Sequence, residues 1–269
     1  MLPTDVPDQD CRVTVGAGVQ EAAGAAARTV ADAIVDAVRR RGVARVIFAS
    51  APSQEAMLAV LARDERIDWS KVRSFHMDEY LDLAMDRPQA FGQWLADRLP
   101  LAALPGFERI RADTEDGADE IARYGALITA APVDVTCLGV GVNGHIAFNE
   151  PGITDFADSA WVREVTLDLV SRQQQVDDGL FADVSDVPAR ALTLTVPALA
   201  SASLMVCTVL GAQKAPAVAR ALTGPVESAC PASRLQDHPR ALWFLDPDAA
   251  RELSTTPGPG GLTASSSMA

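Results

Sequence analysis

The chain has 269 residues, of which 48% are hydrophobic, and a formal net charge of −13 at pH 7. This length and apolar content suit one large domain with an ample core. The acidic balance argues against nucleic acid or an anionic membrane as a partner, because both need a basic surface, and an anionic substrate would have to be held by local cations and backbone N–H groups.

Strand-like and helix-like stretches alternate along the chain. Short apolar runs rich in β-branched residues predict strands at 12–15, 44–49, 72–77, 133–138, 162–167, 191–196, 204–210 and 241–245. Intervening stretches predict helices at 19–41, 54–63, 88–99, 116–130, 214–222 and 247–253. Such alternation is typical of βαβ units. The sequence therefore predicts an α/β fold, a doubly wound and largely parallel sheet with helices on both faces in a modified Rossmann-like arrangement.

Composition also predicts how the chain is organised. Residues 1–253 are expected to form a single domain, and 254–269, rich in Ser, Thr, Gly and Pro, are expected to be a disordered tail. No apolar run is long enough to span a bilayer and no signal peptide pattern opens the chain, so we expect a cytoplasmic protein. The four cysteines are widely spaced and form no CxxC or His/Cys cluster, which predicts free thiols and no metal site.

The most informative segment is CLGVGVNGHIAFNEP at 137–151. An apolar strand breaks into glycines, which permit close approach of a ligand, and then presents His145 and Glu150 five residues apart. An imidazole beside a carboxylate that orients it is suited to proton transfer near neutral pH. Taken alone, the segment fits an active-site loop and a glycine-rich turn with a solvated histidine about equally well.

A second polar cluster follows another predicted strand. Asp78 and Glu79 come directly after the run at 72–77, beside Tyr80. Open α/β sheets bind ligands just beyond the carboxyl ends of their strands, so this cluster and the histidine loop can converge. For either carboxylate alone, a helix N-cap or a solvated turn would be the simpler interpretation. The two motifs together favour an active site.

These motifs resemble the glucosamine-6-phosphate deaminase family, which shares its fold with the 6-phosphogluconolactonases. The segment LGAQKA at 210–215 resembles the family's lysine-bearing segment, and SRLQDHP at 233–239 resembles its late Ser-x-Leu-Gln-x-His-Pro element. The similarity follows the family order from about residue 44 to about residue 247, which makes a chance match at one motif a poor explanation.

The resemblance implies a cofactor-free enzyme that converts glucosamine 6-phosphate, or an epimer, into fructose 6-phosphate or the corresponding ketose phosphate, with release of ammonia. By the same resemblance, His145 would open the pyranose, Asp78 would move a proton from C2 to C1, and Glu150 would orient His145. Asn143 stands where well-known members carry an aspartate, and its amide supplies no negative charge. Glu79 is an additional candidate for the base.

The resemblance also implies a phosphate site. Its expected residues are Ser50, Ala51, Ser53, Gly144, Arg172 and Lys214. The loop at 49–55 joins a strand to a helix, where N–H groups and the helix dipole can hold a phosphate, and Lys214 would pair with it as a point charge. In the alternative interpretation Ser53 only caps the next helix and Lys214 is solvated. Members use an arginine near 171–178, and either Arg172 or a neighbouring residue would take that place.

Other functions stay open at this stage. A 6-phosphogluconolactonase would share the fold and the Gly-His loop but needs only hydrolysis, so the additional carboxylates favour the deaminase. A catalytically silent sugar-phosphate sensor would explain Asn143 as decay, yet Asp78, His145 and Glu150 are all retained. No GxGxxG follows the first strand, which disfavours a dinucleotide-dependent dehydrogenase. The sequence leaves open the substrate epimer and the oligomeric state, a homo-oligomer included. The region after Pro151 lacks the basic residues of allosteric members, so no such activation is expected.

Overall fold

The computed structural model describes residues 12–100, 105–112 and 117–253. Its strands are β1 Val13–Val15, β2 Ala44–Phe48, β3 Val72–His76, β4 Asp78–Tyr80, β5 Phe107–Glu108, β6 Val135–Leu138, β7 Val162–Thr166, β8 Arg190–Leu194, β9 Leu204–Val209 and β10 Ala241–Leu245. Its α-helices are α1 Val19–Arg41, α2 Glu55–Leu61, α3 Phe91–Ala96, α4 Gly117–Thr129, α5 Leu169–Asp177, α6 Val196–Leu199, α7 Ala215–Thr223 and α8 Pro247–Ala250. Short 3-10 helices lie at Pro52–Gln54, Trp69–Lys71, Val184–Asp186, Ala212–Lys214 and Pro231–Asp237. The predicted tail, 254–269, lies outside the described residues.

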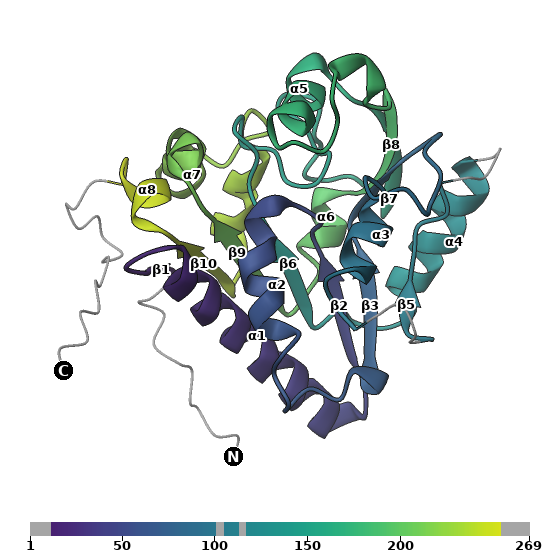
Figure 1. The fold of residues 1–269 in the computed structure, drawn as a ribbon, viewed down its shortest axis with the longest axis vertical. Coiled ribbons are helices and arrows are strands. Elements are labelled where there is room, and N and C mark those ends of the chain that lie inside the picture. Colours follow the sequence, from purple (N-terminus) through teal and green to yellow (C-terminus); the bar gives the residue numbers. More distant parts are fainter. Residues whose placement is uncertain (1–11, 101–104, 113–116, 254–269) are drawn as a thin grey trace.

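A seven-stranded parallel sheet runs through the middle of the molecule in the order β1-β10-β9-β6-β2-β3-β5 (Figure 1). From β2 the chain adds β3 and β5 on one side, then returns to add β6, β9 and β10 on the other. The direction of winding therefore changes between β2 and β6, which is where doubly wound sheets bind their ligands. The predicted doubly wound, largely parallel sheet is confirmed.

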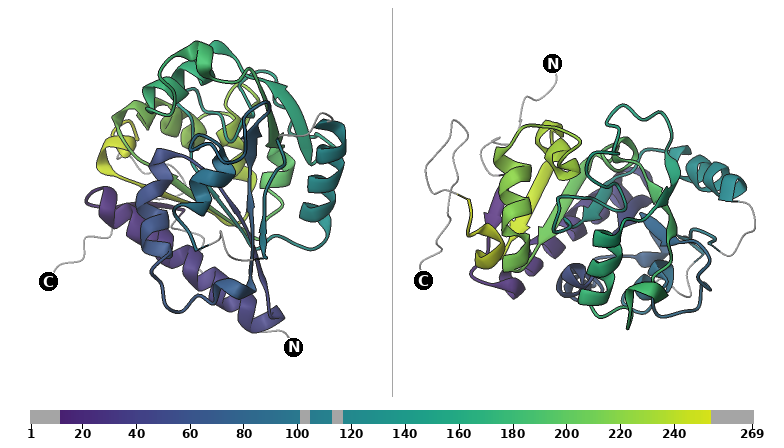
Figure 2. Two further views of the ribbon diagram at one scale, coloured as in Figure 1. Left: turned by 45° about the vertical axis from the view of Figure 1, so that its right-hand side comes forward. Right: turned by 90° about the horizontal axis from the view of Figure 1, so that it is seen from above.

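Helices cover both faces of this sheet, as Figures 1 and 2 show. Side chains of α1, α2 and α3 contribute to one apolar layer, and those of α4, α6, α7 and α8 contribute to the other. Successive strand residues point to opposite faces, so Val46 and Phe48 of β2 belong to the first layer and Ile47 belongs to the second. Burial on both faces explains why the central strands are mostly apolar on both sides and do not alternate between apolar and polar residues.

The long helix α1 has the bounds that the sequence predicts. Its buried side is largely alanine, including Ala23, Ala27 and Ala31, and these small side chains allow a close approach to the sheet. The helix ends at Gly42, whose φ of 77° is the left-handed conformation that favours glycine at a helix C-terminus.

A small antiparallel sheet in the order β4-β8-β7 was not predicted. The runs at 162–167 and 191–196 do form strands, but they pair with each other and with β4 rather than join the parallel sheet. Most of β7 is exposed or half-buried, which suits an antiparallel sheet with one face towards solvent. The sequence pattern also failed to predict β4, β5, α5 and α6.

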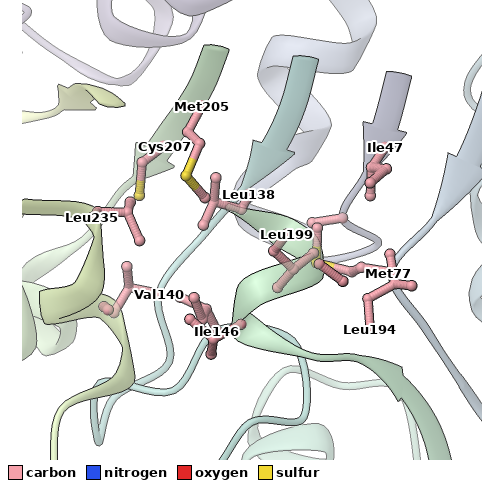
Figure 3. Packing of buried hydrophobic residues seen from close by; sticks show 14 of the residues in the cluster. Ile47, Met77, Leu138, Val140, Ile146, Leu194, Leu199, Met205, Cys207 and Leu235 are labelled. Atoms are coloured by element: carbon pink, nitrogen blue, oxygen red, sulfur yellow. The ribbon is translucent and has the colours of Figure 1, made fainter. Parts of the chain in front are cut away.

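An apolar cluster lies under the carboxyl ends of the central strands (Figure 3). Leu138, Val140 and Ile146 belong to it, so the loop after β6 is anchored in the core on both sides of its polar residues. Within the described ranges, no helix combines the length and apolar character needed to cross a membrane.

Candidate functional site

A cavity of about 500 Å³ opens beyond the carboxyl ends of β2, β3, β6 and β9, at the change in winding direction. Four predicted segments meet there although they are far apart in the sequence. The predicted site residues that line it are Ser50, Ala51, Ser53, Asp78, His145 and Lys214. Glu79, Asn143, Gly144, Glu150 and Arg172 lie outside its lining, and their contacts are described below.

His145 and Glu150 form a buried pair at the two ends of a tight loop. Nδ1 of His145 lies 3.3 Å from Oε1 of Glu150, which leaves Nε2 as the ring nitrogen available to a ligand. Burial by itself would raise the pKa of Glu150, but its interactions with His145, Ser171 and Asn143 outweigh burial and hold that pKa below its usual value. Glu150 is therefore a carboxylate at neutral pH.

Two backbone features of this loop shape the site. A Cβ at Gly141 would lie 2.3 Å from ring atoms of His145, so the imidazole occupies space that only glycine leaves free. Ala147 lines the cavity with a φ of 49°, a left-handed conformation that a side chain disfavours. Gly144 also has a positive φ, and a Cβ there would lie 2.8 Å from Sγ of Cys230. Gly144 thus makes room for Cys230, and it does not line the cavity.

Asn143 forms hydrogen bonds to both His145 and Glu150. Its Nδ2 donates to Oε2 of Glu150 over 2.8 Å, and its Oδ1 accepts the backbone N–H of His145 over 3.0 Å. Because a carboxylate only accepts hydrogen bonds, the amide nitrogen must be the atom directed at Glu150. The Asn143 side chain therefore contacts the backbone of His145 and the Glu150 carboxylate.

We expect Asn143→Asp to raise the pH at which Glu150 titrates. The new carboxylate would lie where the amide donates, 2.8 Å from Oε2 of Glu150. Two carboxylates this close share a proton, so the apparent pKa of the pair rises above that of Glu150 alone. The side-chain carboxyl ¹³C resonance followed against pH measures this shift. Asn143→Ala is the control, because it removes the hydrogen bond without adding charge and should move the midpoint less. A midpoint that stays in place in Asn143→Asp would contradict this geometry.

Asp78 and its neighbour Glu79 have different surroundings. Asp78 lines the cavity while largely buried; burial raises its pKa well above the usual value, and the adjacent Glu79 raises it further. Glu79 accepts the backbone N–H groups of Tyr80, Phe91 and Gly92 at 3.1, 2.9 and 2.9 Å. The bonds from Phe91 and Gly92 tie β4 to the start of α3. Burial raises the pKa of Glu79 to about 7 against the opposing effect of those donors.

His76 locks the backbone next to Asp78. Its Nε2 accepts the N–H of Ile110 over 2.9 Å, so Nδ1 carries the proton and donates to the carbonyl of Asp78 over 2.9 Å. The hydroxyl of Tyr124 accepts the N–H of His76 and donates to its carbonyl. Burial lowers the pKa of His76 to about 3, so the ring stays neutral and keeps its hydrogen bonds to the backbone of Asp78 and Ile110.

The same cavity is lined by the phosphate candidates Ser50, Ser53 and Lys214. Ser50 donates to the carbonyl of Phe91 over 3.0 Å, and Ser53 lies in the turn before α2. The first turn of α2 has no side-chain cap, so Ser53 does not cap this helix. Lys214 follows β9 and is largely buried; burial lowers its pKa, an effect that Asp178 partly offsets.

Arg172 lies away from the cavity. Its guanidinium donates to the carbonyls of Val184 and Val187, at 2.6 and 3.2 Å, and so fastens the neighbouring 3-10 helix to α5. The α5 segment presents Gln174, Gln175 and Asp178 to the cavity instead. Within the part of the chain that the structure describes, Lys214 is the one lysine or arginine that lines the cavity.

Comparison with known proteins shows the family of this chain. Residues 18–243 match the family model described as glucosamine-6-phosphate isomerases/6-phosphogluconolactonase. The chain belongs to this family. Glucosamine-6-phosphate deaminase from Rhodopirellula baltica is 35% identical over 84% of this chain and 90% of its own length. The enzyme of that name from Streptococcus equi subsp. zooepidemicus is 34% identical over 70% of this chain and 78% of its own length.

Solved structures of this family share the architecture. A monomeric glucosamine-6-phosphate deaminase superimposes with a TM-score of 0.82 at 28% identity, over 90% of this chain and 99% of its own. A 6-phosphogluconolactonase from Trypanosoma brucei gives a TM-score of 0.72 at 18% identity, over 91% of this chain and 99% of its own. At that identity, the second likeness concerns the fold alone.

Sequence reasoning missed two residues that support the site. His76 was part of a predicted strand, and nothing in its neighbours indicates that its ring would brace Asp78. Ser171 donates a hydrogen bond to Oε1 of Glu150 from α5, 21 residues further along the chain. The family resemblance of its segment indicates only an arginine, and no short motif links a serine at that distance to Glu150.

Proposed function

We propose that this family member is a glucosamine-6-phosphate deaminase, which releases ammonia from an aminosugar 6-phosphate and leaves the ketose 6-phosphate. The observation that carries the proposal is one cavity lined by Asp78, which is a buried carboxylate, by His145, whose imidazole faces Glu150, and by the cation Lys214. Hydrolysis of a lactone needs one proton-transfer group, whereas an isomerisation followed by deamination uses both Asp78 and His145.

The first step opens the sugar ring. Nε2 of His145 accepts the proton of the C1 hydroxyl and returns a proton to the ring oxygen as the C1–O5 bond breaks. Glu150 stabilises the imidazolium that forms between these two transfers, since its carboxylate lies 3.3 Å from Nδ1. The product of this step is the open-chain aldehyde.

The second step moves a proton between carbons. The carboxylate of Asp78 takes the proton from C2 while the substrate's ammonium group gives a proton to O1, so that an enolamine forms. Asp78 then delivers its proton to C1, which becomes the CH2OH group and leaves an imine at C2. Water adds to the resulting imine at C2 and ammonia leaves, so that the ketose forms. A raised pKa suits Asp78 to this work, because a stronger base removes a C–H proton more easily near neutral pH.

The charges around the cavity fit a zwitterionic substrate. Lys214 and the N–H groups of the loop at 50–53 would hold the phosphate, since that loop leads into a helix. Asp178 and Asp248 add negative charge to the same lining, which favours a protonated amine.

An ammonia-release assay tests this function. Glucosamine, galactosamine and mannosamine 6-phosphates are compared with the corresponding free amino sugars, and 6-phosphogluconolactone hydrolysis is followed alongside. We expect ammonia from at least one of the phosphorylated sugars and none detectable from the free sugars. Lactone hydrolysis without ammonia release, or equal turnover of free and phosphorylated glucosamine, would overturn the proposal.

Lys214→Ala should raise KM for the aminosugar phosphate by about 10- to 100-fold, which corresponds to about 1.5–3 kcal/mol for a lost hydrogen bond to a charged group. The effect on kcat should be smaller, since the phosphate lies away from the reacting carbons. Steady-state kinetics measure both. Lys71→Ala is the matched control, because Lys71 is an exposed lysine paired with Asp68 on the 3-10 helix before β3. An unchanged KM in Lys214→Ala would remove Lys214 from the phosphate site.

A further inference from the structure

The carboxylate of Glu150 accepts a hydrogen bond from Ser171, which has no part in the proposed chemistry. Oε2 accepts from Asn143 over 2.8 Å, while Oε1 lies 3.3 Å from Nδ1 of His145 and also accepts the hydroxyl hydrogen of Ser171. Glu150 and Ser171 are 3% and 1% exposed, so these bonds are made out of solvent. A bond to a buried carboxylate is stronger than one in water.

Ser171 is itself held in place by the helix that carries it. It lies in the first turn of α5, and its backbone N–H donates to the N-cap carboxylate of Asp168 over 2.7 Å. The N-cap fixes the backbone of this turn, which leaves the hydroxyl free to donate to Glu150.

The same helix reaches the substrate cavity one turn later. Gln174 and Gln175 line the cavity, and the side chain of Gln174 accepts the N–H of Val142 in the histidine loop over 3.4 Å. One helix therefore contacts both the carboxylate behind His145 and the space that a sugar would fill.

We propose that Ser171 is a positioning residue, which holds the Glu150 carboxylate against Nδ1 of His145 and joins α5 to this pair. Its effect on turnover rests on the proposed function, whereas its effect on Glu150 follows from the contacts alone. Without the hydroxyl, Oε1 would keep only the imidazole and the carboxylate could rotate away from it. The ionised form of Glu150 would also lose one of its donors.

The charged groups on the far side of Glu150 do not replace Ser171. A cavity of about 340 Å³ there is lined by Glu150 together with Asp155, Asp158 and Arg163. Arg163 is paired with Asp158, so its charge is already neutralised. The remaining carboxylate, Asp155, would disfavour the ionised form of Glu150.

Ser171→Ala tests the proposal, with Ser171→Thr to restore the hydroxyl and Gln173→Gly as the control. Gln173 is exposed within α5 and its side chain bonds to Asp177, so a glycine there loosens the helix by about 1 kcal/mol without removing a contact of Ser171 or Glu150. On the pH plateau, Ser171→Ala should lower kcat about tenfold with KM within about twofold of wild type, the effect of one lost hydrogen bond to a charged group. Ser171→Thr should restore most of kcat, and Gln173→Gly should retain it.

A second measurement does not depend on turnover. The side-chain carboxyl ¹³C resonance of Glu150, assigned by its absence in Glu150→Gln, is followed against pH in each variant. Loss of a donor to the ionised form raises a pKa, so the midpoint in Ser171→Ala should rise by about one pH unit, with Gln173→Gly unchanged.

The outcomes separate the two proposals. Wild-type protein that releases no ammonia overturns the proposed function, while the carboxyl titration still decides the role of Ser171. An unchanged midpoint in Ser171→Ala, or an equal loss of kcat in Gln173→Gly, would show that Ser171 only supports the fold of α5 and would overturn this inference.

Discussion

Asp78→Asn is expected to fold normally and to lose about 10²- to 10⁴-fold in turnover, the usual range for a general acid–base group. An amide has nearly the same volume as the carboxylate but cannot accept the C2 proton. Because burial and Glu79 raise the pKa of Asp78, its charge is costly in the folded protein, and a neutral amide should not destabilise the site.

An isotope experiment assigns the loss to the carbon-to-carbon transfer. In D2O the wild type should place deuterium at C1 of the ketose or at C2 of recovered substrate, and Asp78→Asn should not. Glu79→Gln is the matched comparison, because it changes a buried carboxylate that accepts three backbone N–H groups. Glu79→Gln should lower the free energy of unfolding by about 1–3 kcal/mol, because one of these backbone N–H groups loses its acceptor. The isotope exchange should be retained. Near wild-type deamination by Asp78→Asn would make Asp78 a structural residue.

The raised pKa of Asp78 also predicts the sign of the pH dependence. Asp78 must be ionised to act as a base, so turnover should fall as the pH drops through its raised pKa, well above the usual range for an aspartate. Glu79→Gln removes the neighbouring carboxylate that contributes to this shift, so its acid limb should move to lower pH.

His145→Gln is expected to lose about 10²- to 10⁴-fold in turnover of the pyranose substrate, because a glutamine amide cannot exchange a proton with the C1 hydroxyl and the ring oxygen. The residual product formed in D2O should still carry deuterium, since Asp78 is intact. Steady-state rates and the isotope content of the product therefore separate ring opening from the later proton transfer. Loss of deuterium from the residual product of His145→Gln would contradict the division of roles.

Gly141→Ala offers an independent test of the same residue. A Cβ there would lie 2.3 Å from the imidazole, so the ring must leave the position in which Nδ1 faces Glu150. We expect a loss of kcat approaching that of His145→Gln, although the catalytic side chains are all retained. Gly152→Ala is the comparison at a nearby glycine, where a Cβ has no neighbour within 4 Å and only the positive φ is disfavoured. An active Gly141→Ala enzyme would show that the imidazole works in another position.

Local sequence patterns were enough to predict the parallel sheet and the segments that bring chemistry to its edge. Runs such as Ala44–Phe48 are buried on both faces, so their composition already indicates central strands. The position of a polar cluster at a strand end is also local information, and the rule for open α/β sheets turns it into a site. Asp78 and His145 could therefore be expected around one cavity from their places in the chain, and the family resemblance added Lys214.

The distant partners that these segments meet depend on how the whole chain packs. The strand at Val162–Thr166 has a local pattern that suits either sheet, and its pairing with Arg190–Leu194 placed it in the small antiparallel one. Arg172 has the charge for a phosphate, yet the carbonyls of Val184 and Val187 take its guanidinium. Ser171 contacts Glu150 because the packing of the helix Leu169–Asp177 brings the two residues together. A hydrogen bond between residues far apart in sequence depends on backbone paths that no local pattern of side chains encodes.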